Sequence, residues 1–228
     1  RDKAGWAALA RAALEPNPFY EADFLAAAGH HLGRGARLKL LVVRDTTDSA
    51  LAGLFPLRKP RWREGILFDA LSLYTNEYSS LSTPLIRAEG AAEILDTAFR
   101  FLAGKHDIPQ VLHFGKLAGS RPFHALLLAH AEAARLPALT VMRHDRAAIE
   151  TRLTVEAYRA RDNASTRKSL NRKQKRLEAL GTLTFAVIPG DAPDALAGFL
   201  ALEASGWKGH RGTALASPEE IINEARNG

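Results

Sequence analysis

The fold of this chain is decided by residues 37–57, which read RLKLLVVRDTTDSALAGLFPL. Residues 37–44 predict a strand that is buried on both faces toward its end, because apolar residues follow one another there without alternation. The segment from Asp45 to Ser49 has the polar composition of a turn. Residues 51–57 predict a second strand, so we expect an antiparallel hairpin.

Helices and further strands are predicted on both sides of this hairpin. Residues 6–14 and 18–32 predict two helices, and Asn17 can cap the second, with Pro18 in its first turn. The later elements are expected as strands over 66–74 and 82–87, a helix over 90–103, a strand over 110–117, a helix over 122–136 and a strand over 139–149. This order favours a mixed α/β layer architecture over a helical bundle or a β-sandwich.

A domain boundary is predicted near residues 152–164, which gives an N-terminal domain over 1–152 and a second unit over 153–228. The second unit is expected to contain a basic helix over 165–180 with Leu170, Leu177 and Leu180 on its buried side, a strand over 182–188, a helix over 191–207 and a short helix over 217–228. Helix, strand and helix follow in the same order as in the first domain, so a second, incomplete copy of a similar unit is expected. One strand cannot form a sheet alone.

Composition limits the classes of function. The chain of 228 residues has no cysteine, which excludes disulfides, thiolate zinc sites and cysteine nucleophiles and fits a cytoplasmic location. Its formal charge of +6 favours anionic partners such as phosphates, nucleotides or RNA. No apolar run reaches the roughly 18 residues of a membrane helix. The histidines form no metal-binding pattern, and no P-loop, dinucleotide or nucleophile-elbow motif occurs, so we expect no metal.

Two segments carry a resemblance to a known family. They are residues 165–178, STRKSLNRKQKRLE, and residues 202–209, LEASGWKG. Together they resemble the opening of the GNAT-type domain in CelD-like and BioF2-like acetyltransferases. Asn76-Glu77-Tyr78 and Thr83-Pro84-Leu85 resemble the preceding half of the same proteins. The resemblance implies two GNAT-like folds in tandem, each a mixed sheet flanked by helices, as in Fem-type aminoacyltransferases.

The resemblance also implies a donor substrate, either acyl-CoA such as acetyl-CoA or, in the Fem branch, aminoacyl-tRNA. GNAT domains hold the pyrophosphate of CoA with a glycine-rich loop at a helix N-terminus. The glycine-rich segment from His31 to Gly35 follows a predicted helix and leads into a strand, which is the wrong context. In the second unit the loop is expected beyond Gly228, so this chain is expected to lack the donor site.

Candidate substrate-binding residues lie in two segments. Lys168 and Arg172 of the basic helix could hold phosphates of CoA, a lipid-linked sugar or tRNA; the alternative is a solvated face packed on acidic neighbours. Tyr74, Asn76 and Tyr78 follow an apolar strand, where polar side chains often bind ligands. The alternative there is an ordinary loop whose tyrosines pack inward.

Glu77 and Glu203 are the candidate general bases for an acceptor amine. Glu203 shares an apolar stripe with Leu200 and Trp207, where burial would raise the pKa of its carboxyl group. The alternative for Glu203 is an ion pair with Lys208 or with an arginine of the basic helix. Trp207 could stack on a sugar or base or serve as a core anchor, and Lys208 beside it is also a substrate-binding candidate.

The leading hypothesis is an acyltransferase that acts on an amine or hydroxyl of a sugar, glycan or cell-envelope precursor. One alternative is a non-catalytic module whose basic helix binds RNA or an anionic glycan, and another is a tRNA-dependent aminoacyltransferase of the Fem type. If the second unit is incomplete, a homodimer is expected to cover its exposed edge.

Overall fold

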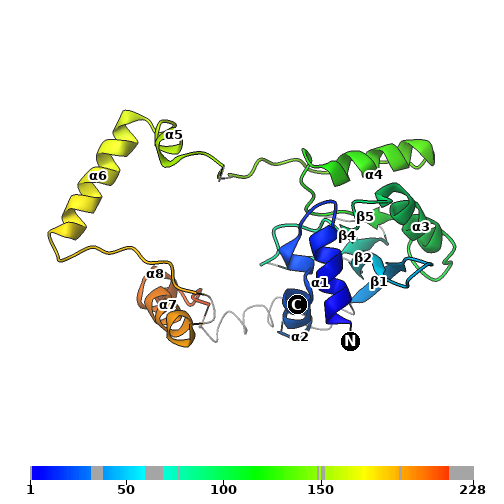
Figure 1. Cartoon of the computed structure of the whole chain (residues 1–228), viewed down its shortest axis with the longest axis horizontal. Coiled ribbons are helices and arrows are strands. Elements are labelled where there is room, and N and C mark those ends of the chain that lie inside the picture. The colour runs from blue at the N-terminus through cyan, green and yellow to red at the C-terminus, as the bar shows by residue number, and fades with distance from the viewer. Residues whose placement is uncertain are drawn as a thin grey trace. The chain divides into compact units, whose positions relative to one another are not determined.

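The structure is a computed structural model that describes residues 2–31, 38–59, 69–76, 78–147, 149, 152–189 and 192–215. The chain divides into two compact units, Arg1–His144 and Asp145–Gly228. In the described residues an open mixed sheet and several helices form the secondary structure (Figure 1). The predicted α/β class is therefore confirmed.

The first unit is built on the predicted hairpin. Strand β1 (Lys39–Arg44) pairs antiparallel with β2 (Leu51–Arg58). β1 is the edge strand, and its residues alternate: Leu41 and Val43 pack against the core, while Leu40 is 44% exposed. The prediction that this strand is buried on both faces toward its end was wrong: α3 packs on one face of β1, and Leu40 and Val42 on the other face are exposed.

Strand β2 is the central strand, and it is buried from Ala52 to Arg58. Two short strands lie end to end along its other side. β3 (Leu71–Leu73) pairs antiparallel with the end of β2, at Leu57 and Arg58, and β4 (Leu85–Ile86) pairs antiparallel with its start, at Gly53 and Leu54. The chain thus leaves the sheet after β3, makes an excursion, and rejoins the same edge of β2 as β4.

The break between β3 and β4 lies opposite Pro56. Tyr74 donates its backbone N–H to the carbonyl of Pro56 at 2.8 Å. In an antiparallel ladder the residue opposite would return a hydrogen bond to the Tyr74 carbonyl, but proline has no N–H to give. When the two registers are continued, Tyr74 and Thr83 both fall opposite Pro56. The excursion therefore begins and ends where the donor is missing.

Strand β5 (Leu112–His113) completes the sheet by pairing parallel to β3. Ser72 and His113 are opposite one another, and Ser72 Oγ lies 2.9 Å from His113 Nδ1. The predicted strands over 66–74, 82–87 and 110–117 are thus present in the described residues as the shorter β3, β4 and β5.

The helices of this unit pack on the sheet or on one another: α2 contacts α1 and η1, and α4 contacts α3. They are α1 (Lys3–Ala12), the 3-10 turn η1 (Pro18–Tyr20), α2 (Ala22–His31), α3 (Ala91–Ala103) and α4 (Pro122–Ala133). α1 packs on β2 and β4, and α3 packs on β1, β2 and β4. Gly53 allows α3 to approach, because a Cβ there would lie 2.7 Å from Ile94 Cγ2. Asn17 caps η1 by accepting from Phe19 N at 3.1 Å, as predicted, although the expected helix over 18–32 is divided into η1 and α2.

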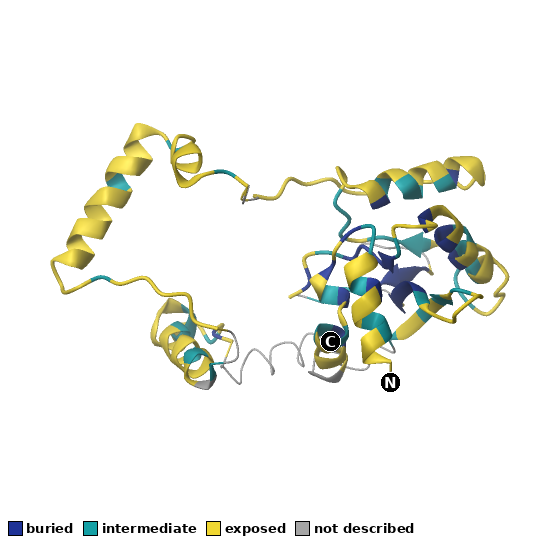
Figure 2. Cartoon of the chain, viewed as in Figure 1, coloured by how far each residue is buried: buried dark blue, intermediate teal, exposed yellow. Residues whose placement is uncertain are grey.

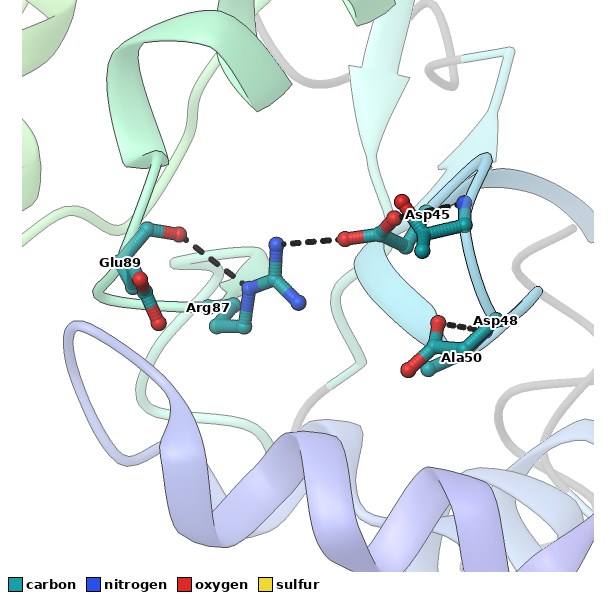
Figure 3. Close-up of polar contacts among 6 residues, drawn as sticks. Asp45, Asp48, Ala50, Arg87 and Glu89 are labelled. Carbon is teal, nitrogen blue, oxygen red and sulfur yellow. Dashed lines mark hydrogen bonds and ion pairs between the residues drawn. The ribbon is translucent and has the colours of Figure 1, made fainter.

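An ion pair fixes the hairpin turn to the start of α3 (Figure 3). Arg87 Nη2 lies 2.9 Å from Asp45 Oδ2, and Arg87 Nε donates to the carbonyl of Glu89 at 3.3 Å. A hydrogen bond from the backbone N–H of Thr47 and the one from Arg87 hold the pKa of Asp45 below its usual range. This carboxylate therefore stabilises the hairpin turn through its bonds to Thr47 and Arg87.

The second unit contains α5 (Val155–Arg159), α6 (Ala164–Glu178), α7 (Pro193–Ser205) and α8 (Trp207–His210), and none of its described residues forms a strand. The predicted basic helix is confirmed as α6, which Asn163 caps by accepting from Thr166 N at 2.8 Å. The helix predicted over 191–207 is divided into α7 and α8 at Gly206. The short helix predicted over 217–228 lies outside the described residues.

Three predictions of buried structure were wrong. Residues 139–147 form no strand, and Val141 and Met142 are 74% and 78% exposed. Residues 182–188 form no strand either, and Phe185 and Val187 are 88% and 100% exposed. Leu170, Leu177 and Leu180, expected on the buried side of the basic helix, are exposed as well (Figure 2). Apolar patterning produces burial only where a second layer or strand is present, and the described part of the chain supplies none at these places.

Among the described residues, no helix combines the length and apolar character needed to cross a membrane.

Candidate functional site

The excursion from Tyr74 to Thr83 is held at both ends by η1 and the residue before it. The Tyr20 hydroxyl donates to the carbonyl of Tyr74 at 2.7 Å, and Asn17 Nδ2 donates to the carbonyl of Thr83 at 2.7 Å. Tyr20, Asn17, Tyr74 and Thr83 are all buried. Tyr20 therefore supplies to Tyr74 the hydrogen bond that Pro56 cannot give, and Asn17 does the same for the carbonyl at the other end.

The predicted binding residues of this loop lie close together. Asn76 Oδ1 accepts from the backbone N–H of Tyr78 and from Ser79 Oγ, each at 2.9 Å, and Asn76 Nδ2 lies 3.4 Å from the Tyr74 hydroxyl. Tyr74 is buried, whereas Tyr78 is 43% exposed. Asn76 thus shapes the loop and Tyr78 is its accessible aromatic. Glu77 lies outside the described residues.

Lys116 joins this loop to the end of β5. Its Nζ donates to the carbonyls of Ser79 at 2.5 Å and Asn76 at 3.3 Å. Its backbone N–H donates to Ser82 Oγ at 3.0 Å, and its carbonyl accepts from Ser82 N at 2.9 Å. Because β3 and β5 are parallel, their carboxyl ends meet at one edge of the sheet, where ligands commonly bind in α/β proteins.

A buried cation lies beside the same loop. Arg58, at the end of β2, is 6% exposed and donates through Nη2 to Thr75 Oγ1 at 3.2 Å. Burial raises the pKa of the Tyr20 phenol, while the charge of Arg58 acts in the opposite direction. Tyr20 is therefore a neutral hydroxyl that donates its hydrogen bond across the whole physiological pH range.

Sequence reasoning missed Lys116, Arg58 and Tyr20, and assigned Asn17 only to a helix cap. Lys116 gave no signal of a site, because it lies inside the strand predicted over 110–117, whereas the observed β5 ends at His113. Tyr20 and Asn17 gave no such signal, since their partners are backbone carbonyls more than fifty positions away in the sequence.

In the second unit, Glu203 forms the ion pair that was the alternative to a catalytic role. Lys208 Nζ lies 2.5 Å from Glu203 Oε1, and the backbone N–H of Leu215 donates to Oε2 at 3.0 Å. The Glu203 side chain is 7% exposed. The hydrogen bond from Lys208 and then the one from Leu215 lower the pKa of its carboxyl group. Both oxygens are engaged in closing the turn after α7.

Two other residues of the 202–209 motif, Gly209 and Trp207, lie in or beside this turn. A Cβ on Gly209 would lie 1.7 Å from the carbonyl oxygen of Ala204, so only glycine allows α8 to approach the end of α7 so closely. Trp207 is 63% exposed, with the guanidinium carbon of Arg211 5.4 Å from its ring centre. Within its own unit Trp207 is an exposed platform and not a core anchor.

Helix α6 carries a basic stripe, which we define as Lys168, Arg172 and Lys175. These residues are spaced by four and three positions, so they share one helix face and span about 10 Å of its length. All three are exposed. In the part of the second unit that the structure describes, no carboxylate forms an ion pair with any of them. The alternative for this helix was a solvated face packed on acidic neighbours, and among the described residues no acidic side chain is paired with the stripe.

Comparison with known proteins gives one match. Residues 164–225, about a quarter of the chain, match the model of a family described as acetyltransferase (GNAT) domain. No curated protein and no solved structure matches the chain. The described residues include no group of three or more His, Asp or Glu side chains placed to hold a metal ion.

Proposed function

We propose that this chain takes part in the transfer of an acyl group from acyl-CoA to an amine or hydroxyl of a sugar, glycan or cell-envelope precursor. The observation that carries the proposal is the match of residues 164–225 to an acetyltransferase (GNAT) domain. Acyl-CoA supplies the acyl group as a thioester. The resemblance of residues 76–78 and 83–85 to the first half of CelD-like and BioF2-like proteins agrees with the same reaction.

The glycine-rich loop that holds the CoA pyrophosphate in GNAT domains was not found in the sequence, so the proposed contacts to the donor phosphates come from the basic stripe alone. Lys168 and Arg172 are exposed, and their side chains have no carboxylate partner in the described part of the chain. Charge-assisted hydrogen bonds from lysine and arginine to phosphate are among the strongest polar contacts in proteins. We assign these two residues to phosphate binding, with the exposed indole of Trp207 as an additional contact for a base or sugar. Lys208 is bound to Glu203 and contributes to the turn that presents Trp207.

The excursion between β3 and β4 fits the acceptor. It combines the exposed Tyr78 and the amide of Asn76, which follow the carboxyl end of β3, with the guanidinium of the buried Arg58, which contacts Thr75 from β2. Glu77 is the proposed general base, because it lies within this loop sequence, whereas both carboxylate oxygens of Glu203 are engaged. The donor and acceptor assignments concern separate units.

The test is calorimetric titration with acetyl-CoA of the chain and of its Lys168→Glu/Arg172→Glu variant. Saturable binding that free CoA competes for, and that the double variant weakens at least about tenfold, is expected from the loss of two charge-assisted contacts. Lys173→Glu is the matched control, because Lys173 is turned about 140° from Lys168 on the helix. Equal weakening by the control, or no binding by the chain at any concentration, would contradict the phosphate assignment.

A second candidate function rests on the same stripe. A row of exposed cations without acidic partners also fits the phosphate backbone of RNA, either in a non-catalytic binding module or in a tRNA-dependent aminoacyltransferase. Binding to RNA releases counterions, so its affinity falls steeply as salt rises, with a slope set by the number of phosphate contacts. Titration of a tRNA between about 50 and 200 mM salt distinguishes this function from CoA binding, which free CoA would displace.

A further inference from the structure

Residues 182–188 of the second unit, TLTFAVI, have the properties of a strand but no strand partner in the described residues. Phe185, Val187 and Ile188 are 88%, 100% and 59% exposed. The segment has no charged residue. Exposed segments with high β-propensity, no charge and unpaired backbone groups readily pair with another chain.

We propose that this segment pairs with the same segment of a second copy of the chain and forms an antiparallel two-stranded ribbon about a twofold axis at Phe185. In this register Phe185 lies opposite its own copy, and Leu183 lies opposite Val187. These residues share one face, because side chains alternate along a strand. The cross-strand pairs on that face are then all apolar, and such pairs stabilise antiparallel strands.

Charge selects the antiparallel arrangement. α6, which precedes the segment, carries six basic residues and one acidic residue, Glu178. α7, which follows it, has Asp194 in its first turn and no basic residue, and its other carboxylate, Glu203, lies near the far end and is paired with Lys208. Antiparallel pairing brings the end of one copy's α6 near the start of the other copy's α7, so opposite charges meet. Parallel pairing would place the two α6 helices side by side, where their charges repel.

The flanking helices supply the second layer that a ribbon needs. A two-stranded ribbon alone is marginally stable and requires a helix or a further strand against its apolar face. Leu170 and Leu177 of α6 and Leu196 and Phe199 of α7 are between 52% and 62% exposed. Each copy therefore offers apolar helix surface, and four helices over one ribbon form a two-layer α/β unit.

The test uses the absence of cysteine in the chain. In the proposed register a cysteine at position 185 faces its own copy, at a separation that a disulfide spans. Phe185→Cys is expected to form a covalent dimer under mild oxidation at least about ten times faster than Val187→Cys, which faces Leu183. Equal rates for the two variants, or no covalent dimer for either, would overturn the proposal.

Light scattering provides an independent measurement on the full chain. A mass that rises with concentration toward about twice 24.8 kDa is expected, and Ala186→Pro should keep the chain monomeric. With Phe185 in a non-hydrogen-bonded pair, the N–H of Ala186 points to the partner strand, and proline removes this donor. Residues 182–188 donate no backbone hydrogen bond to another described residue, so the substitution removes none of those. Ala186→Ser, which keeps the N–H at the same position, is the control. A strictly monomeric chain, a dimer that survives Ala186→Pro, or growth beyond the dimer would refute the pairing.

Discussion

Replacing Tyr20 by phenylalanine removes one hydroxyl from a side chain that is fully buried. That hydroxyl donates at 2.7 Å to the carbonyl of Tyr74. Because Pro56 opposite has no N–H, the carbonyl loses the donor that replaces the missing ladder bond. The expected consequence is a destabilised first unit, with the largest effect at the junction between β3 and the loop that follows it.

The magnitude follows from the burial of both groups. Leaving a buried carbonyl without its donor costs about 1–3 kcal/mol, and we take about 2 kcal/mol. For the 144 residues of the first unit, an unfolding entropy of about 2.1 cal/mol/K per residue converts this loss into a fall of roughly 7 °C in the melting temperature.

Calorimetric melting of the chain measures this shift, and hydrogen exchange locates it. Tyr74→Phe is the matched control, because it makes the same change in a buried side chain whose hydroxyl has, among the described residues, a single long contact of 3.4 Å with Asn76. We expect Tyr74→Phe to lower the melting temperature by less than half as much, and exchange at residues 74–83 to increase only in Tyr20→Phe. Equal shifts in the two variants, or a shift under about 2 °C for Tyr20→Phe, would refute the role given to this hydrogen bond.

Three further predictions concern Asn17, which holds the far end of the loop, and Gly209 and Glu203, which shape the turn after α7. Asn17→Ala removes both the cap of η1 and the donor to the far end of the loop, so it should cost about 2–3 kcal/mol in chemical unfolding, and a loss below about 0.5 kcal/mol would contradict the clamp. Gly209→Ala places a methyl group against the Ala204 carbonyl; hydrogen exchange over residues 203–215 should increase, whereas Gly198→Ala, with open space around it, should not change it. The lowered pKa of Glu203 means that its carboxylate stabilises the turn above the ordinary carboxyl pKa of about 4.3 and that this stabilisation is lost as pH falls through the lowered value. The protection of the Leu215 amide, meaning its exchange rate relative to the intrinsic rate at each pH, should therefore fall as the solution is acidified from pH 5 to about pH 3. Glu203→Gln should abolish that step, and a pH step that persists in the variant would assign it to another group.

The elements predicted from the sequence agree best with the structure where residues close together in the chain determine them. Asn17 before Pro18 predicted a cap, and the hydrogen bond to Phe19 N confirms it. Residues 37–57 predicted a hairpin because both strands and the turn between them are contiguous, and the observed register confirms it. The amphipathic helix over 90–103 is α3, with Ile94 and Leu95 buried.

The predictions failed where the outcome depends on a neighbour distant in the sequence. Residues 139–147 and 182–188 have strand composition, but a strand also needs a paired edge, and no local pattern reports whether one is present. Position 42 was expected to be buried because its neighbours are apolar, yet Val42 is on the outer face of an edge strand and is 38% exposed.

The candidate site was predictable only where its residues are close together in the sequence. Tyr74, Asn76 and Tyr78 were selected because they follow an apolar strand, and the structure places them in one loop. Their supports, Tyr20 and Lys116, could not be paired with them from the sequence, because only the folded sheet brings these distant segments together.

The position of Pro56 makes the pairing of the sheet independent of the loop between β3 and β4. Since Tyr74 and Thr83 both fall opposite this proline, the segment between them enters and leaves the ladder at one point, and its length does not set the register of β3 or β4. Insertions or replacements over residues 76–81 should therefore leave the sheet intact. The sequence of the loop can therefore diverge, or be replaced by design, while Tyr20 and Asn17 hold its two ends in place.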